Sequence, residues 1–251
     1  MERRFKINDI DVKARAGEHL LDVARRYGFE IPSLCHHEAL PPIGACRICL
    51  VEVAWGGRRE LCTSCNFEVI EGMQVTTDTP AVQHHRAMNL ELLLARAPGS
   101  ARLRELAAQY GVRRTRFGPP ATSPLPNCIL CELCVRACEQ LGNHALTMVG
   151  RGDKKRIGLA FNSPSEQCTG CASCASVCPT ECIPVKDTAA GRTIWGQTHP
   201  LVLCKVCGAP VMTERQRAKA IAKKGLPEEY YDFCESCKQS TASKRFASIV
   251  W

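Results

Sequence analysis

Two runs of cysteines with the same spacing constrain this chain more than any other feature of its sequence. Each run has the form C-x2-C-x2-C-x3-C, and Pro179 follows the second run. Runs of this form hold 4Fe–4S clusters in pairs, and the fourth cysteine of each run ligates the other cluster. Zinc knuckles or a disulfide framework would not need two complete runs. We therefore expect one cluster on Cys128, Cys131, Cys134 and Cys178, and a second on Cys168, Cys171, Cys174 and Cys138.

The cysteine content also indicates how the chain is stabilised and where it works. The 251 residues include 18 Cys but only 7 Phe, so metal centres must supplement small apolar cores. Paired cysteines without a visible signal peptide indicate a reducing cytosol and metal ligation, not disulfides. No apolar run approaches the roughly 18 to 20 residues of a membrane span. We expect a cytoplasmic protein without a transmembrane segment.

The formal net charge of +8 would ordinarily suggest a nucleic-acid partner. That count treats every cysteine as neutral, whereas a cluster or a zinc ion held by four thiolates carries a net charge of about −2. Four such centres would contribute about −8 and bring the loaded protein close to neutrality. We therefore expect no nucleic-acid partner.

The N-terminal third has the pattern of a small sheet wrapped around a further iron–sulfur site. Residues 3–15 alternate around Asn8-Asp9, which predicts a hairpin, and residues 17–27 have the apolar spacing of a helix. A loop with the spacing C-x10-C-x2-C follows, and its first gap is longer than in the plant-type pattern. Three 2Fe–2S ligands would be Cys35, Cys46 and Cys49, and the spacing leaves Cys62 or Cys65 as the fourth.

Two connecting segments surround the first cysteine run. Residues 112–127 are basic and then rich in proline, which predicts an extended linker. Residues 144–161, between the two runs, predict two strands around a Gly-Asp turn.

The C-terminal segment carries a third cysteine pattern. Two C-x2-C pairs are separated by 26 residues that include a basic helix at about residues 213–224. Two such pairs are typical of a closed tetrahedral zinc site. A 4Fe–4S cubane uses the same thiolate ligands and remains the alternative. The four ligands would be Cys204, Cys207, Cys234 and Cys237.

From about Arg4 to Val185, the order and spacing of these segments resemble a known family. The segments CHHEALPPIGACRICLVEV, HHRAMNLELLLARAPG, LRELAAQYGV and MVGRGDKKRIGLAFNSP are similar to the N-terminal part of the large Fe–S subunit of respiratory complex I. They equally resemble the diaphorase Fe–S subunit of NAD-reducing hydrogenases. In both families the fourth 2Fe–2S ligand has a context like SCNFEVIEGM, which implies Cys65 and leaves Cys62 unused.

Both families have one cluster that this chain lacks. They place a centre bound by one histidine and three cysteines where this sequence reads ARAPGSARLRELA. We interpret the nearby His84 and His85 as a solvated helix start, and Cys62 and Cys182 as buried packing thiols. Without that centre, electrons would either cross directly to a 4Fe–4S cluster or enter through a partner's cluster. We expect the partner route, with a mobile 2Fe–2S domain as a further alternative.

These interpretations predict an α+β chain with five segments. Residues 1–79 would form a β-grasp 2Fe–2S domain, and residues 80–118 a helical connector. A Pro-rich linker at 119–127 would lead to a two-cluster bacterial ferredoxin-like 4Fe–4S domain at 128–187. Residues 188–251 would form a small zinc-ribbon-like module with four cysteines.

The resemblance implies a subunit that transfers single electrons. The chain has no complete Gly-rich dinucleotide fingerprint and no nucleophile–base pair, so we expect no catalytic residues. A flavin- and NAD-binding diaphorase subunit would lie on one side. A catalytic redox subunit would lie on the other: a hydrogenase, a formate dehydrogenase or another low-potential reductase, within a hetero-oligomeric complex. The alternatives are an Fe–S sensor or nucleic-acid module that uses the basic tail, marked by salt-dependent binding, and a free soluble ferredoxin.

Overall fold

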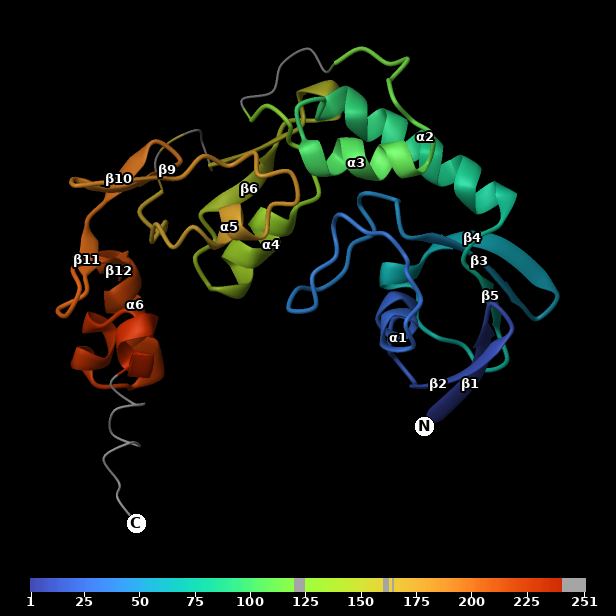
Figure 1. Ribbon diagram of the computed structural model, residues 1–251, viewed down its shortest axis with the longest axis horizontal. Helices are drawn as coiled ribbons and strands as arrows, with labels where there is room; N and C mark the ends of the chain where they lie inside the picture. Colours follow the sequence, from blue (N-terminus) through green and yellow to red (C-terminus); the bar gives the residue numbers. More distant parts are fainter. Residues whose placement is uncertain (120–124, 160–162, 164, 241–251) are drawn as a thin grey trace.

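The structure of the chain, a computed structural model, describes residues 1–119, 125–159, 163 and 165–240. These residues form an arch (Figure 1). The N-terminal sheet forms one foot of the arch, and the C-terminal helix α6 lies in the other. The span between them is made by helices α2 and α3 and by the segment that carries the two cysteine runs.

The N-terminal foot is a five-stranded sheet of mixed direction with helix α1 (Leu20–Arg26) packed against it. The strand order is β2-β1-β5-β3-β4; β1 and β5 run parallel, and the other neighbours are antiparallel. Asn8 and Asp9 have φ of 47° and 66°, the left-handed conformation that a two-residue hairpin turn requires. The predicted hairpin and helix are both present. The strands are β1 (Glu2–Ile7), β2 (Ile10–Arg15), β3 (Leu50–Trp55), β4 (Arg58–Thr63) and β5 (Gln74–Thr76).

The connector consists of α2 (Pro80–Arg96) and α3 (Ala101–Gln109), which pack against each other. The hydroxyl groups of Thr79 and Ser100 cap them by accepting backbone N–H bonds. Leucines of both helices form one core with the loop of Cys35 and with the start of the first 4Fe–4S run. The connector therefore packs against both cluster regions.

The segment with the cysteine runs contains α4 (Leu133–Gln140) and α5 (Ser173–Ser176). The strands predicted between the runs are present as the hairpin of β6 (Leu146–Val149) and β7 (Arg156–Leu159), with a 3-10 turn at Gly152–Lys154. Most of the predicted Pro-rich linker, residues 120–124, lies outside the described residues. Its described end is packed, because Leu125 is buried in the third core of the molecule.

The C-terminal part begins with a sheet of three short strands, β8 (Lys186–Thr188), β9 (Gly191–Ile194) and β10 (Gln197–His199). Ile194 of β9 is buried in the same core as the 4Fe–4S cysteines, so this sheet packs across the predicted boundary at residue 188. The four-cysteine segment follows. It contains β11 (Leu201–Leu203), β12 (Pro210–Thr213), α6 (Glu214–Lys224) and a 3-10 turn at Glu228–Asp232.

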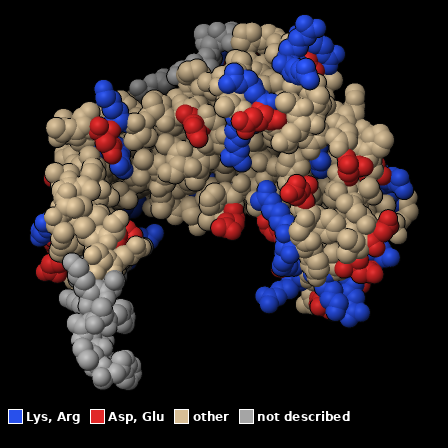
Figure 2. Space-filling view, viewed as in Figure 1, with Lys and Arg blue, Asp and Glu red and all other residues tan. Residues whose placement is uncertain are grey.

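The surface of the molecule carries both signs of charge. On the face shown in Figure 2, Lys and Arg side chains are interspersed with Asp and Glu, and no single basic patch extends across it. Within the described residues, no helix is long and apolar enough to cross a membrane.

Candidate iron–sulfur and metal sites

The structure brings together the four cysteines predicted to hold a 2Fe–2S cluster. Cys35, Cys46, Cys49 and Cys65 are all buried. The backbone N–H of Cys46 donates to Sγ of Cys35 at 3.3 Å, and the thiol of Cys65 interacts with the thiols of Cys35 and Cys49. A short 3-10 turn, Ser64–Asn66, places Cys65, and the N–H and hydroxyl of Ser64 both donate to the carbonyl of Cys49.

Cys62 has a different environment. It lies in β4 opposite Val51 and packs, half-buried, against the core of the N-terminal sheet. Burial raises the pKa of its thiol to about 12, with a further contribution from Glu60. No hydrogen bond joins Cys62 to another thiol in the described part of the chain, which favours Cys65 as the fourth ligand.

Two cavities lie in the segment of the cysteine runs, and each is lined by one predicted ligand set. The first contains three cysteines of the first run and Cys178, and the second contains three cysteines of the second run and Cys138. Cys182 also lines the first cavity, with its Sγ 3.6 Å from that of Cys178. The interpretation of Cys182 as a packing thiol therefore missed its contact with the first site.

The two cysteine loops follow the same backbone path. Leu130 and Gly170 occupy equivalent positions and have φ of 54° and 67°, while Glu132 and Ala172 both have φ of 60°. Left-handed residues in such loops turn backbone N–H groups toward one concave side, which suits an anionic Fe–S cluster. Backbone strain of this kind persists where a site needs it. The thiolate donors and these loops fit two 4Fe–4S clusters.

Two hydrogen-bond donors at the second cavity could not be predicted from the cysteine spacing. The indole N–H of Trp195 donates to Sγ of Cys174 at 3.4 Å, and the backbone N–H of Ala145 donates to Sγ of Cys138 at 3.3 Å. Burial raises the pKa of Cys174 to about 11, and the bond from Trp195 opposes that rise. Trp195 follows β9 and is distant in sequence from the second run, so spacing could not have identified it.

Arg136 joins the 2Fe–2S loop to the first 4Fe–4S run. Arg136 lies on α4 and is only 6% exposed. One terminal nitrogen, Nη2, donates to the carbonyls of Cys35 at 2.9 Å and Cys131 at 3.2 Å, and Nη1 donates to the carbonyl of Pro41. Together with the connector, whose leucines share a core with both regions, Arg136 packs the 2Fe–2S loop against the first 4Fe–4S run.

Among the described residues, His84 and His85 belong to no cluster of metal-ligating side chains. His84 and His85 are exposed on the first turns of α2, where their rings make an edge contact and Nδ1 of His85 lies 2.8 Å from the carbonyl of Ala81. No cysteine occurs in the sequence between Cys65 and Cys128. This agrees with the interpretation of these residues as a solvated helix start.

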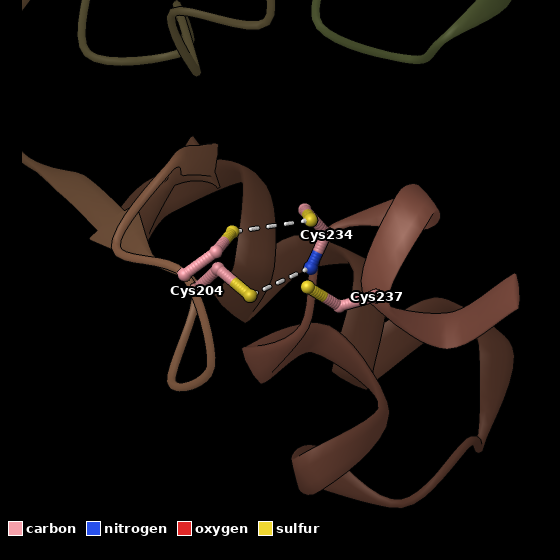
Figure 3. Close-up of side chains that lie close together, drawn as sticks. Cys204, Cys234 and Cys237 are labelled. Atoms are coloured by element: carbon pink, nitrogen blue, oxygen red, sulfur yellow. Dashed lines mark hydrogen bonds between the residues drawn. The ribbon is translucent and has the colours of Figure 1, made fainter. Parts of the chain in front are cut away.

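The four C-terminal cysteines converge on one point. Their sulfurs all lie within 4.8 Å of one another, and Figure 3 shows those of Cys204, Cys234 and Cys237 turned toward each other. The sulfurs of Cys207 and Cys234 are 3.6 Å apart. In the part of the chain that the structure describes, no other three His, Cys, Asp or Glu side chains bring their ligand atoms so close together.

The first cysteine pair lies in a knuckle turn. The N–H of Gly208 donates to the carbonyl of Cys204, and Gly208 has a φ of 71°, which a side chain would oppose. The backbone N–H of Cys234 donates to Sγ of Cys204 at 3.3 Å. Backbone N–H groups of Cys234 and Cys207 lower the pKa of Cys204 to about 6, so its thiolate is favoured at neutral pH.

Comparison with known proteins agrees with these geometries. Residues 2–80 match the model of a 2Fe–2S iron–sulfur cluster binding domain, and residues 125–185 match that of a 4Fe–4S dicluster domain. The chain is 30% identical over 229 residues to an NADH-quinone oxidoreductase subunit of Rhizobium meliloti (strain 1021), covering 82% of this chain and 26% of the relative. The chain is an iron–sulfur protein homologous to this subunit.

Further relatives belong to other enzymes. The chain is 29% identical over 231 residues to "NADPH-Fe(3+) oxidoreductase subunit alpha" of Geobacter sulfurreducens, which covers 83% of this chain and 27% of the relative. It is 32% identical over 193 residues to "NADP-reducing hydrogenase subunit HndD" of Solidesulfovibrio fructosivorans, covering 65% of this chain and 33% of the relative. The chain thus spans about a quarter to a third of the length of these curated relatives.

A solved structure shares the fold. One chain of a crystal structure of NAD+-reducing [NiFe]-hydrogenase in the H2-reduced state aligns with a TM-score of 0.63 at 24% identity. The alignment covers 91% of this chain and 98% of that chain.

Proposed function

We propose that this chain is the electron-transfer subunit of a multi-subunit oxidoreductase linked to NADH or NADPH. The observation that carries the proposal is the presence of three cysteine-lined sites within one continuous packed body, joined by the connector and by Arg136. Homology to subunits of NADH-quinone oxidoreductase and of an NADP-reducing hydrogenase supports it. A partner subunit on one side would bind the flavin and the dinucleotide. A second partner on the other side would carry out the substrate chemistry, as a hydrogenase or formate dehydrogenase subunit would.

Twelve cysteines of the chain would hold the three clusters. One 2Fe–2S cluster would be held by Cys35, Cys46, Cys49 and Cys65, and the two 4Fe–4S clusters by the crossed ligand sets of the two runs. When bound, such clusters supply one-electron transfer without proton chemistry. The chain itself fixes the thiolates, supplies N–H donors to their sulfurs and covers the sites with apolar side chains.

The packing supports the direct connection between the 2Fe–2S site and the first 4Fe–4S site. Cys35 and Cys131 share the donor Nη2 of Arg136 and belong to the same apolar core. Burial raises the pKa of Cys131 to about 12, and the neighbouring thiolates, including that of Cys35, add to the rise. This packing favours direct electron transfer between the two sites over transfer through a partner's cluster.

We also propose that the C-terminal site holds a single zinc ion. Tetrahedral zinc with Zn–S bonds of about 2.3 Å places its sulfurs about 3.8 Å apart. The separation of 3.6 Å between Cys207 and Cys234, and the 4.8 Å limit on all four sulfurs, suit ligands that share one ion. The four thiolates of a cubane bind four different irons, so their sulfurs must be spread more widely. A site closed by four thiolates leaves no open position and would be structural.

Analysis of the purified holoprotein tests the proposed function. We expect about ten iron atoms per chain, from one 2Fe–2S and two 4Fe–4S clusters. The chain isolated alone should not be reduced by NADH or NADPH, whereas the complex purified from its native host should be reduced by one of them. Iron analysis and electron paramagnetic resonance measure both. An iron content near six, or a complex whose clusters neither nucleotide reduces, would contradict the proposal.

Loss of the C-terminal metal should unfold only that module. In a Cys204→Ser/Cys237→Ser variant we expect the zinc content to fall from about one ion per chain to none, because two thiolates cannot hold a structural site. Iron content should stay at the wild-type level. Elemental analysis and limited proteolysis measure these effects, with Cys62→Ser as a control cysteine substitution outside the sites. Wild-type protein with about fourteen irons and no zinc would show that the site holds a cubane.

A further inference from the structure

The C-terminal module packs directly on the loop that forms the second 4Fe–4S site. The hydroxyl of Thr213, the N-cap of α6, donates to the carbonyl of Thr169, between two predicted ligands of that site. Arg215 donates through Nη1 to the carbonyls of Glu166 and Cys168 at 3.2 and 3.4 Å. The start of α6 is therefore fixed against the second cysteine run.

Lys219, one turn further along α6, reaches the other side of the same site. Its Nζ donates to the carbonyl of Gly142 at 2.7 Å and to Oδ1 of Asn143 at 2.5 Å. Nδ2 of Asn143, which is itself buried, lies 3.3 Å from Oγ1 of Thr169 and 4.0 Å from Sγ of Cys171. A single amide thus connects the ammonium group of α6 to a ligand of the second site.

Arg215 and Lys219 form no ion pair with a carboxylate of the described residues. The bonds of Lys219 and Arg215 go to carbonyl and amide oxygens, and among the described residues neither cation has a carboxylate within 4.0 Å. Burial raises the pKa of Cys138 and of Cys168, and the charges of Lys219 and Arg215, respectively, oppose these rises. Arg192 also faces the site but is paired with Asp187 at 2.8 Å. Lys219, which is partly buried, is screened less by solvent than the exposed Arg215.

The four-cysteine site determines where α6 lies. Asp232, two residues before Cys234, accepts from Arg217 of α6 at 3.0 Å and pairs with Lys205 of the first knuckle at 2.6 Å. The hydroxyl of Tyr231 donates to the carbonyl of Ala220, also in α6. Because the metal would tie the two knuckles together, it would also hold the helix that carries Lys219.

We propose that the C-terminal module tunes the second 4Fe–4S cluster: Lys219 raises the reduction potential of that cluster, and metal bound by the four C-terminal cysteines is needed to keep Lys219 in place. The proposal rests on the clusters and the metal of the proposed function. Reduction adds one electron and takes the net charge of the cluster from about −2 to about −3. A nearby cation stabilises the more negative state more strongly, so removing it lowers the potential.

Redox titration of the isolated holoprotein, followed by electron paramagnetic resonance, tests the role of Lys219. In Lys219→Met we expect the equilibrium constant for reduction of one 4Fe–4S cluster to fall about fivefold, which is about 40 mV for a one-electron couple. The other 4Fe–4S cluster is the internal reference. Lys219→Arg, which keeps the charge, should retain the wild-type potential, and so should Lys223→Met, which removes an exposed charge from the same helix.

Two further variants complete the test. Trp195→Phe removes the hydrogen bond to Cys174 and should lower the potential of the same cluster, which identifies its signal. Cys204→Ser/Cys237→Ser should lower that potential with the iron content unchanged. The role of Lys219 would be overturned if Lys219→Met had the wild-type potentials. It would also be overturned if Lys219→Met and Trp195→Phe shifted the potentials of different clusters. An unshifted cluster in the metal-free variant would overturn the dependence on metal. Because a chemical reductant is used without partners, these results do not depend on the proposed NAD(P)H-linked function.

Discussion

Replacing Cys65 with serine is expected to remove the 2Fe–2S cluster while both 4Fe–4S clusters remain. Cys65 is 1% exposed, and its thiol interacts with those of Cys35 and Cys49. Serine offers a hard oxygen in place of the soft thiolate that Fe–S clusters require. The iron content should therefore fall from about ten to about eight atoms per chain. Iron analysis and the electron paramagnetic resonance signal of the reduced 2Fe–2S cluster measure the change.

Cys62→Ser is the matched control, because Cys62 lies only three residues away and is also partly buried. Its side chain packs on the N-terminal sheet, so the substitution should cost at most about 1 kcal/mol of stability and leave the iron content unchanged. Loss of the 2Fe–2S signal in Cys62→Ser, with retention in Cys65→Ser, would reverse the assignment of the fourth ligand.

The sequence predicted the ligands of a site wherever the spacing of neighbouring cysteines determines them. The two repeated runs predicted the crossed ligand sets that line the two cavities, and the two C-x2-C pairs predicted the convergence of four thiols at one point. The choice between Cys62 and Cys65 needed the family context. The structure supports Cys65, because its thiol lies among those of Cys35 and Cys49, whereas Cys62 lies within β4.

The residues that connect the sites could not be predicted in this way. Arg136 lies between Cys134 and Cys138, where a charged side chain on a short helix suggests a solvent-exposed face. Arg136 is buried by the 2Fe–2S loop, and Cys35 of that loop is 101 residues away from it in the sequence. Lys219 and Gly142 are likewise 77 residues apart. Contacts between residues so far apart in sequence depend on how the connector and α6 pack. Neither the periodicity of apolar residues nor the cysteine spacing predicts them.

The linker shows the same limit of local reasoning. Its Pro-rich composition predicted an extended segment and allowed a mobile 2Fe–2S domain. In the structure, Oδ1 of Asn127 accepts from the N–H of Gly99 at 2.7 Å, and Nε of Arg96 donates to the carbonyl of Cys128 at 3.3 Å. The end of α2 and the turn after it therefore hold the start of the first run.

Substitution of Arg136 by methionine is expected to separate the two cluster regions. The guanidinium is buried, and three carbonyl groups, those of Cys35, Pro41 and Cys131, accept its hydrogen bonds. Methionine leaves these oxygens without their donor, which should destabilise the packed form by about 3 to 5 kcal/mol. Thermal unfolding of the holoprotein should show a lower midpoint for the N-terminal region, and limited proteolysis should cut the connector sooner.

The geometry of the guanidinium, and not its charge alone, should be required. Two terminal nitrogens serve three carbonyls from two regions of the chain, and one ammonium group cannot reproduce that fork. Arg136→Lys should therefore recover only part of the lost stability. Arg104→Met, at an exposed position on α3, should change the free energy of unfolding by no more than about 0.5 kcal/mol. If Arg136→Met has the unfolding midpoint and the cleavage rate of the wild type, Arg136 does not join the two regions. Packing of the connector alone would then hold the 2Fe–2S site against the first 4Fe–4S site.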